Sequence, residues 1–407
     1  MKKNILFCAL LLSTASTFAQ CDGERYLNRV FTSIIDTQNI IYSNSNGATG
    51  LRMDVYEPAE DPSTRRPLII FAHGGSFVAG DENVSDIVQF CQRFAKHGYV
   101  TASIQYRLAQ FTDLADSTKM IETVVKALHD MKAAVRYFRN DAATANRFRI
   151  DPNMIFVGGA SAGAILAVHL TYLTDLAELP DHVVQIVNEN GGTEGNSGYP
   201  GYSSEVAGVI NFCGGINQAQ WIDAGEKPIV SIHGTSDGTV PYGHGEVLQS
   251  NPISQLFTLV TLDGSSIIHA RAEEVGLYNA LWSIPNEDHM AHASAAHIDE
   301  SESFVANFLH PIVCSSVGIE QPTPESSVQI QPNPNQGSFS VVLPQQLQGE
   351  CVITLTDLSG RVINQNTYNA NNGSPINLTQ ANLNAGLYLL HIQGKQQVNT
   401  VRVLVER

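Results

Sequence analysis

The stretch that decides the fold is Met154-Ile155-Phe156-Val157-Gly158-Gly159-Ala160-Ser161-Ala162-Gly163. Its first four residues are apolar and predict a buried strand, and residues 162–172 predict a helix. Between them lies the pattern G-x-S-x-G, whose glycines allow a sharp turn from strand to helix. Such a turn projects a serine above the edge of a sheet, so Ser161 is the candidate nucleophile. A phosphate-binding loop is disfavoured, because no Lys-Ser/Thr follows and no G-x-G-x-x-G is present.

Outward from this stretch, apolar strands alternate with helices over residues 51–309. The alternation predicts a doubly wound, mostly parallel α/β sheet with helices on both faces. Sheets of this kind hold their sites at the carboxyl ends of the strands. The predicted strands are 68–72, 99–105, 154–157, 206–212, 228–233 and 281–284, and the predicted helices are 86–97, 119–139, 162–172 and 293–308.

A Gly-rich loop, His73-Gly74-Gly75-Ser76, follows the strand at residues 68–72. Backbone N–H groups in such a loop can stabilise the oxyanion of acyl transfer. The candidate donors are the N–H groups of Gly75 and Ser76 and that of Ala162, the residue after the serine. An ordinary strand-ending turn is the alternative, and we expect His73 to hold the loop in either case.

Two further residues complete a candidate triad. Asp237 follows the strand at residues 228–233 and is the candidate orienting acid, although an Asp in a Gly-rich turn is often only a turn residue. Among thirteen histidines, His289 lies in a loop five residues after Ile284 and is the first candidate base. His292 is the second, because we expect it to enter the closing helix. The chain order Ser, Asp, His differs from the orders of the two familiar serine protease classes.

Several blocks together resemble bacterial α/β-hydrolase carboxylesterases of the hormone-sensitive-lipase-like and feruloyl-esterase-like kinds. The resemblance covers about residues 50–310 and implies an α/β-hydrolase fold and ester hydrolysis with no metal or other cofactor. One position departs from it, because Ser76 stands where these enzymes usually carry a third glycine. A small residue can still present its N–H there. The blocks are His73-Gly74-Gly75, Tyr106-Arg107-Leu108, Asp151-Pro152, residues 159–163 and His233-Gly234-Thr235-Ser236-Asp237.

The composition changes after Cys314. Residues 315–327 are rich in Ser, Gly, Gln and Pro and predict a linker. Beyond them the period becomes two, which predicts a small β-sandwich over residues 328–407. The predicted strands are 338–342, 351–355, 386–392 and 398–405. A carbohydrate-binding sandwich is an alternative, but both tryptophans lie before residue 315.

This C-terminal segment resembles the type IX secretion sorting domain of Bacteroidetes. The resemblance rests on three blocks in order, Gln331-Pro332-Asn333-Pro334 with Gly337, residues 355–360, and residues 383–388. It implies export across the outer membrane with the type IX machinery as partner, followed by removal of the domain.

The N-terminus predicts a secretory signal peptide over residues 1–19, which leaves residues 20–314 as the catalytic domain. Two lysines precede an apolar run that is too short to span a bilayer, and small residues lead to a cleavage site after Ala19. A lipoprotein anchored through Cys21 is less favoured, because the bulky Gln20 precedes that cysteine. We therefore expect an extracellular or cell-surface protein that passes through the periplasm and has no transmembrane segment.

Composition limits the partners and the cysteine chemistry. With 23 basic and 39 acidic side chains the formal net charge is -16, which disfavours nucleic acids as partners. Because an exported chain can keep disulfides, we favour the pairs Cys21–Cys91 and Cys213–Cys314, with buried free thiols as the alternative. No CxxC and no Cys/His cluster occurs in the sequence, so a zinc site is not supported.

Residues 190–204 hold five glycines, two tyrosines and no aliphatic residue. Tyr199, Tyr202 and Trp221 are candidates for an aromatic substrate site, and a solvated surface loop is the equal alternative. The leading function is a secreted carboxylesterase acting on small-molecule or polymer-linked esters. Feruloyl or acetyl polysaccharide esters and polyesters remain open as substrates. A peptidase is less favoured, and a non-catalytic binding module on a hydrolase fold is the alternative of another class.

Overall fold

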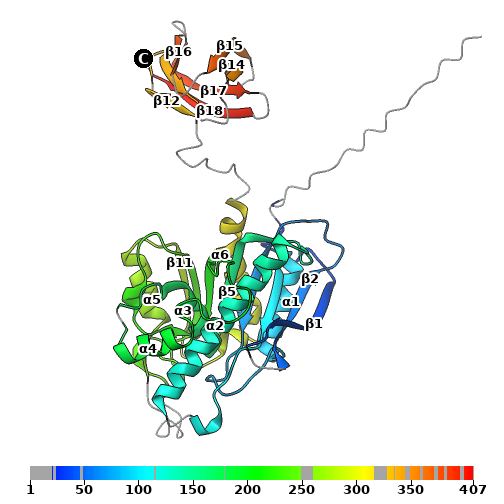
Figure 1. Cartoon of the computed structure of the whole chain (residues 1–407), viewed down its shortest axis with the longest axis vertical. Helices are drawn as coiled ribbons and strands as arrows, with labels where there is room; N and C mark the ends of the chain where they lie inside the picture. The colour runs from blue at the N-terminus through cyan, green and yellow to red at the C-terminus, as the bar shows by residue number, and fades with distance from the viewer. Residues whose placement is uncertain are drawn as a thin grey trace, which may run out of the picture. The chain divides into compact units, whose positions relative to one another are not determined.

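The computed structural model describes residues 21, 24–45, 49–113, 116–177, 179–248, 260–315, 328–333, 335–343, 349–357, 361–370, 375–379, 383–394 and 398–406. The chain divides into two compact units, residues 1–318 and 319–407 (Figure 1). The predicted signal peptide at residues 1–19 lies outside the described residues, as does the predicted linker apart from its first residue.

An eight-stranded sheet forms the centre of the first unit, in the order β1-β2-β4-β3-β5-β6-β8-β11. The pairs from β4 to β11 are parallel, whereas β1 and β2 pair antiparallel at one edge. This confirms the predicted α/β fold class with a mostly parallel sheet. The strands are β1 (Ile34–Ser43), β2 (Leu51–Pro58), β3 (Arg66–Ala72), β4 (Val100–Ile104), β5 (Ile150–Ala160), β6 (Gly208–Phe212), β8 (Ile229–Gly234) and β11 (Asn279–Ile284).

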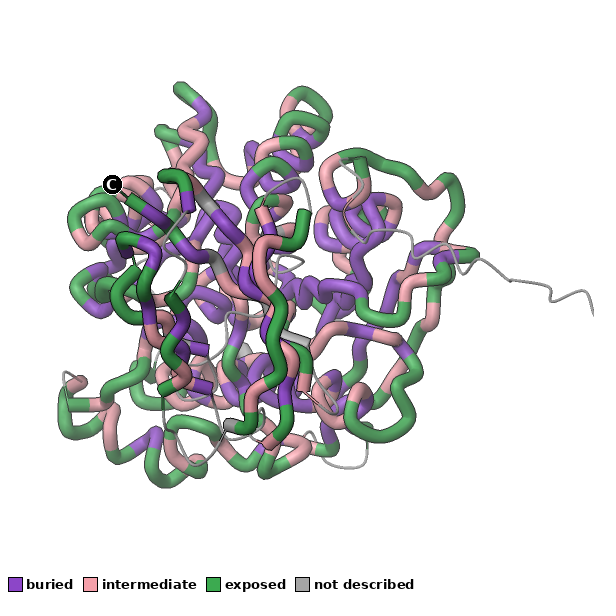
Figure 2. The backbone as a smooth tube through the Cα atoms, turned by 90° about the horizontal axis from the view of Figure 1, so that it is seen from above, coloured by how far each residue is buried: buried purple, intermediate pink, exposed green. Residues whose placement is uncertain are grey.

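Helices cover both faces of the sheet, because fully apolar strands must bury both sides. Helices α2 (Ser117–Ala143), α3 (Ala162–Tyr172) and α5 (Ser265–Glu274) pack with Ile70 in one apolar cluster. Helices α1 (Ser85–His97) and α6 (Ile298–Ser315) pack with Ile69 and Phe71 in the other. Figure 2 shows this buried interior in purple. Among the described residues, no helix is both long and apolar enough to cross a bilayer.

Smaller elements surround this frame. Helix α4 (Asp181–Glu189) packs on α2 through Ile186 and Val125. A second small sheet has the order β7-β10-β9. Its strands are β7 (Gly215–Ile216), β9 (His244–Glu246) and β10 (Thr261–Gly264), and short 3₁₀ turns lie at η2 (Phe111–Asp113), η3 (Ala219–Trp221) and η5 (Ala291–Ala293).

The closing helix begins later than predicted, at Ile298 instead of residue 293. The chain before it forms η5, in which Ala293 N–H donates to the Met290 carbonyl and the turn is not continued as a helix. The expectation that His292 enters this helix is therefore wrong. Ser301 Oγ donates to the His292 carbonyl at 2.9 Å and holds the turn against the first residues of α6.

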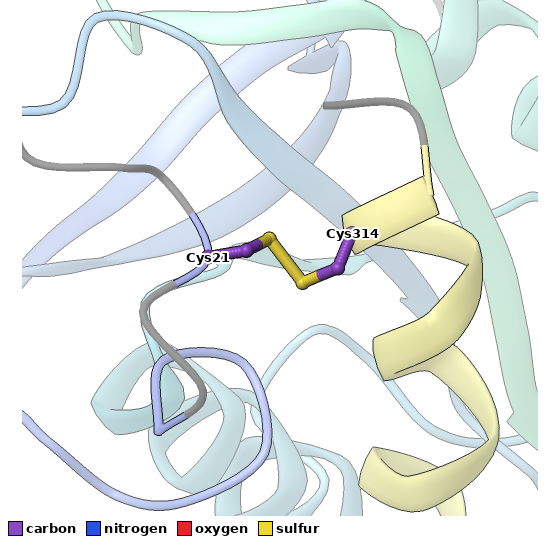
Figure 3. Close-up of a disulfide and its surroundings, with 2 residues drawn as sticks. All are labelled: Cys21 and Cys314. Atoms are coloured by element: carbon purple, nitrogen blue, oxygen red, sulfur yellow. A yellow bond between two sulfur atoms is a disulfide. The ribbon is translucent and has the colours of Figure 1, made fainter. Parts of the chain in front are cut away.

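The disulfide joins Cys21 to Cys314, with Cα atoms 5.7 Å apart (Figure 3). Both predicted pairs, Cys21–Cys91 and Cys213–Cys314, are wrong. Cys91 is a buried free thiol on the apolar face of α1, and Cys213 is a buried free thiol directly after β6. The Cys21–Cys314 bond attaches the N-terminal segment to the last turn of α6.

An ion cluster around the buried Glu302 reinforces the same attachment. Glu302 on α6 accepts hydrogen bonds from Arg29 at 2.5 Å and Arg93 at 2.6 Å, and lies 2.7 Å from His97 Nε2. Burial alone would raise the pKa of Glu302, but the bonds from Arg29, His97 and Arg93 outweigh it and lower that pKa to about 2. The cluster joins the N-terminal segment, α1 and α6 through one carboxylate.

The C-terminal unit consists of two antiparallel sheets, β12-β13-β16 and β15-β14-β17-β18. Alternating side chains such as Phe339, Ile353 and Leu390 form its buried core. This confirms the predicted all-β sandwich. The strands are β12 (Gln329–Gln331), β13 (Ser338–Val342), β14 (Gly349–Asp357), β15 (Val362–Ala370), β16 (Ile376–Thr379), β17 (Gly386–Gln393) and β18 (Val398–Val405).

Candidate active site

Ser161 occupies a tight turn between β5 and α3. Its backbone is in a sparsely populated conformation, with φ 54° and ψ -120°. A Cβ on Gly159 would lie 2.5 Å from the Ala72 carbonyl oxygen, so a glycine is needed where β5 passes β3 so closely. The Ser161 N–H donates to the Phe212 carbonyl at 2.9 Å, which ties this turn to the end of β6.

The Gly-rich loop after β3 lies beside this serine. A Cβ built on Gly74 would stand 3.3 Å from the Ser161 Cβ. Gly75 has φ 117° and Ser76 has φ 53°, a conformation that costs energy for a non-glycine residue. The side chain of His73 holds the loop, because its Nδ1 lies 2.6 Å from the Gly74 carbonyl and its ring stacks on Tyr106.

Asp237 and His289 meet at the carboxyl ends of β8 and β11. His289 Nδ1 lies 2.7 Å from Asp237 Oδ2. The other oxygen of Asp237 accepts the backbone N–H groups of Thr239 at 2.8 Å and Val240 at 3.0 Å. The Asp237 side chain is buried, whereas that of His289 remains 17% exposed. The arrangement fixes the carboxylate and leaves one side of the imidazole accessible.

The electrostatics of the pair follow from these contacts. Burial alone would raise the pKa of Asp237, but hydrogen bonds from His233 and His289 outweigh it and hold that pKa well below its usual range. Burial would lower the pKa of His289, but the neighbouring Cys213 and Asp237 raise it. Asp237 is therefore a permanent anion beside the imidazole at neutral pH.

Strands β6 and β8 lie between β5, which precedes Ser161, and β11, which precedes His289. Among the described residues, no hydrogen bond joins the Ser161 hydroxyl to His289. The connection runs through the end of β6, where Phe212 accepts the Ser161 N–H and Cys213, the next residue, lies beside His289. Catalytic hydrogen bonds are often long without substrate and shorten when it binds.

Cys213 was not among the predicted site residues. Its Sγ atom, one ligating atom of His289 and one of Asp237 all lie within 4.8 Å of one another. The same sulfur lies 3.8 Å from Met290 Sδ and 3.8 Å from His292 Nδ1. Burial alone would raise the pKa of the thiol, but His289 and His292 lower it. Its position directly after an apolar strand was the available sequence signal.

His292 lies in the apolar layer behind the site. Its ring stacks on Phe212 at 4.6 Å and on Phe90 at 5.9 Å, and its side chain is buried. The structure thus brings His289, rather than His292, to the carboxylate of Asp237.

Sequence reasoning also missed a polar network behind the acid. His233 Nε2 lies 3.1 Å from Asp237 Oδ2, and His233 Nδ1 lies 2.7 Å from Ser265 Oγ. The Asn211 amide donates to the same Ser265 oxygen at 3.1 Å. The signal for it was His233 itself, four residues before Asp237. The network fixes the position of the acid from the side opposite the backbone donors.

The three aromatic candidates have their contacts away from the triad residues. Tyr199 packs edge-on against Tyr137 of α2, with ring centroids 5.4 Å apart, and Tyr202 is half-buried in the same loop. Trp221 packs against His169 of α3 at 5.8 Å. The loop that carries the tyrosines is attached to α2 by Arg136, which donates to the carboxylate of Glu194 at 2.9 Å.

The sequence matches two family models. Residues 53–214 match the BD-FAE model, and residues 329–406 match the secretion system C-terminal sorting domain. The BD-FAE match covers less than half of the chain and shows a similarity of residues 53–214 to this family. The matched region includes Ser161, the Gly-rich loop and Cys213, and ends before Asp237 and His289.

Several curated proteins to which this chain is similar are named esterases. Esterase LipC of Mycobacterium tuberculosis is 26% identical over 214 residues, which cover 46% of this chain and 49% of the relative. Gut esterase 1 of Caenorhabditis elegans is 27% identical over 130 residues, covering 32% of this chain and 22% of the relative. The chain thus spans less than half the length of these relatives. Among solved structures, Thermogutta terrifontis esterase 2 phosphoramylated by tabun is 20% identical with a TM-score of 0.48, covering 71% of this chain and 97% of its own.

A cavity of about 630 Å³ in the first unit is lined by residues 105–108 and by the first turns of α2. Tyr106 joins it to the Gly-rich loop, because its hydroxyl donates to the His73 carbonyl at 2.8 Å. Two cationic side chains of its wall are paired, Lys119 with Asp113 at 3.1 Å and Lys126 with Glu122 at 2.6 Å. The wall is thus polar, with these charges locally balanced.

Proposed function

We propose that this protein is a secreted serine carboxylesterase that works through an acyl-enzyme. Ser161 is the nucleophile, His289 the general base and acid, and Asp237 the residue that orients the imidazole. The observation that carries the proposal is the 2.7 Å contact between His289 and Asp237, at the same sheet edge as the strained turn of Ser161.

In the first step the Ser161 oxygen attacks the ester carbonyl carbon while His289 takes the hydroxyl proton. The carbonyl π electrons move to oxygen, and their return expels the alcohol, which receives the proton from His289. Water then repeats the sequence on the acyl-enzyme and releases the acid. Throughout, the anionic Asp237 stabilises the imidazolium, and no metal or cofactor takes part.

The tetrahedral oxyanion would be bound by backbone N–H groups. We assign this role to Ala162, Gly75 and Ser76. Supporting it are the closeness of Gly74 to the Ser161 Cβ and the position of Ala162 at the first turn of α3. One such donor is typically worth about 10²–10³ in rate.

The cavity beside Tyr106 favours one class of ester substrate. The open cavity beside Tyr106 has polar walls whose lysines are paired with acids, which suits an uncharged polar group next to the ester. Feruloyl or acetyl esters of polysaccharides fit this better than long apolar acyl chains. We keep polyesters as the alternative substrate and a non-catalytic surface-binding module as the alternative of another class.

Export would follow from the C-terminal unit. The match of residues 329–406 to a secretion system C-terminal sorting domain supports recognition by the type IX machinery. Together with the predicted signal peptide, it supports passage through the periplasm to the cell surface or the medium. No nucleic-acid partner is proposed for a chain of net charge -16.

The test is hydrolysis of p-nitrophenyl acetate, butyrate and octanoate, methyl ferulate and acetylated xylan by the full chain, beside Ser161→Ala and Ser85→Ala. Ser85 is the first residue of α1, has no role in the proposed mechanism and serves as the control serine. We expect activity on short esters that is lost in Ser161→Ala and kept in Ser85→Ala. A folded chain that hydrolyses none of these, or a fully active Ser161→Ala, would overturn the proposal.

A further inference from the structure

Five side chains with atoms that can bind a metal ion lie close to the Cys213 sulfur and are here called the Cys213 cluster. It consists of Cys213, Asp237, His289, Met290 and His292. The donors come from three neighbouring strand ends, because Cys213 follows β6, Asp237 follows β8, and the other three follow β11. The proposed esterase mechanism uses only Asp237 and His289, and leaves the thiol, the thioether and the second imidazole without a role.

We propose that the Cys213 cluster binds one thiophilic metal ion of the Zn²⁺ kind, and that the bound ion inhibits hydrolysis by occupying His289. The binding stands on the cluster alone, whereas its inhibitory effect rests on the proposed function.

The spacing of the donors supports this. Zn²⁺ lies about 2.3 Å from a thiolate and about 2.0 Å from an imidazole nitrogen, so two donors on one tetrahedral ion are about 3.5 Å apart. Cys213 Sγ is 3.8 Å from His292 Nδ1, and Cys213, His289 and Asp237 offer atoms within 4.8 Å of one another. Shifts of about an ångström bring them to bonding distance.

The surroundings of His289 also favour its role as a ligand of the metal ion. A histidine that binds metal usually donates its other ring nitrogen to a carboxylate, which orients the ring and raises its basicity. His289 already has this partner in Asp237, at 2.7 Å. The contact that prepares the imidazole to take a proton from serine therefore also prepares it to bind an ion.

His292 is a second, independent indication. Its side chain is buried, and its Nδ1 atom lies 3.8 Å from the Cys213 sulfur, so a second imidazole nitrogen faces the thiol. Met290 adds a thioether 3.8 Å from the same sulfur. Thiolate, thioether and imidazole donors select Zn²⁺ and similar soft ions, whereas Mg²⁺ and Ca²⁺ require oxygen ligands.

The binding step balances without any redox change. The Cys213 thiol releases its proton to solvent and Sγ bonds to the ion, and a nitrogen lone pair of His289 forms a second bond. That lone pair can no longer accept the Ser161 proton. Loss of a general base costs about 10²-fold or more in rate, which is the inhibition expected at saturation.

Cadmium is the probe, because a thiolate–Cd²⁺ bond gives an ultraviolet charge-transfer band that reports binding without any turnover. We expect the full chain to develop this band with one Cd²⁺ per chain and to lose hydrolysis of p-nitrophenyl acetate in parallel. Excess EDTA should restore both signals. Mg²⁺ should produce neither.

Matched variants locate the ion. Cys213→Ser should abolish the band, whereas Cys91→Ser should keep it, because Cys91 is a buried free thiol of the same unit outside the cluster. If Cys213→Ser does not fold, His289→Asn at the more exposed ligand replaces it, with an expected loss of Cd²⁺ affinity of about tenfold or more.

The outcomes separate the two proposals. A Cys213-dependent band in Ser161→Ala supports the site even if the esterase assignment fails. No band at millimolar Cd²⁺, or a band that survives in Cys213→Ser, overturns the site. A Cys213-dependent band in an active enzyme that loses no activity overturns the role of His289 as a ligand.

Discussion

His233 Nε2 lies 3.1 Å from the same carboxylate oxygen of Asp237 that His289 contacts at 2.7 Å. One buried oxygen thus faces two imidazoles, and the other accepts two backbone N–H groups. Only His289 is partly exposed, since the side chain of His233 is completely buried. His233 is therefore a positioning residue for the acid, and His289 is the ring that can reach a substrate.

Replacing His233 by Ala should lower kcat about tenfold and leave KM nearly unchanged, because the variant loosens Asp237 without touching the substrate. By comparison, removing the residue that orients a metal-binding side chain typically costs about 10–100-fold in activity or metal affinity. Steady-state kinetics on p-nitrophenyl acetate measures kcat and KM separately and so checks this prediction. An equal fall in kcat for a variant of the exposed His244, paired with Asp263 in the small sheet, would argue for a general structural effect instead.

Gly75→Ala should cost about 10²-fold in kcat, because φ is 117° there and an added Cβ meets the backbone of Ala79. The displaced loop would no longer present its N–H groups. Gly276→Ala is the matched control, since that glycine has φ 69° but nothing within 4 Å of an added Cβ. The prediction fails if both variants lose activity to the same extent.

Removing the Cys21–Cys314 bond should lower the free energy of unfolding by about 2–4 kcal/mol, since it closes a long loop and constrains the unfolded chain. Denaturant titration of the double variant Cys21→Ser, Cys314→Ser measures the change. Alkylation of the denatured, unreduced protein should modify Cys91, Cys213 and Cys351. Labelling of Cys314 under those conditions would contradict the pairing.

Glu302→Gln should destabilise the fold by about 1–3 kcal/mol at neutral pH, because hydrogen bonds from charged partners are lost. The pKa of Glu302 is lowered from 4.5 to about 2 in the folded protein, so its stabilising effect is complete above about pH 4.5. The effect is lost as pH falls toward 2. Unfolding curves should therefore differ between wild type and variant at neutral pH and converge in acid, and a constant difference would be the contrary result.

The central part of the fold was predictable because it is local in sequence. The apolar run before Ser161 and the small residues after it predict β5, the turn and α3 from ten consecutive residues. The positions of Asp237 and His289 followed from the ends of two apolar strands. These strands pair in parallel, so their carboxyl ends meet at one edge.

The features that sequence reasoning missed depend on contacts between residues that lie far apart in the sequence. The partner of Cys21 is the last cysteine of the unit, a pairing that no spacing rule reveals. Strand β1 is an edge strand with an irregular burial pattern and two register shifts against β2, so it lacks a clean period of two. Cys213 reaches His289 only because β6, β8 and β11 lie side by side in the sheet.

The central claim, that Ser161 is the residue that becomes acylated, is tested most directly by covalent labelling. The full chain is treated with a serine-directed organophosphate such as paraoxon, digested and mapped by mass spectrometry. We expect one adduct per chain on Ser161, greatly slowed in His289→Asn and absent in Ser161→Ala. An adduct on another serine that accompanies the loss of activity would contradict the account.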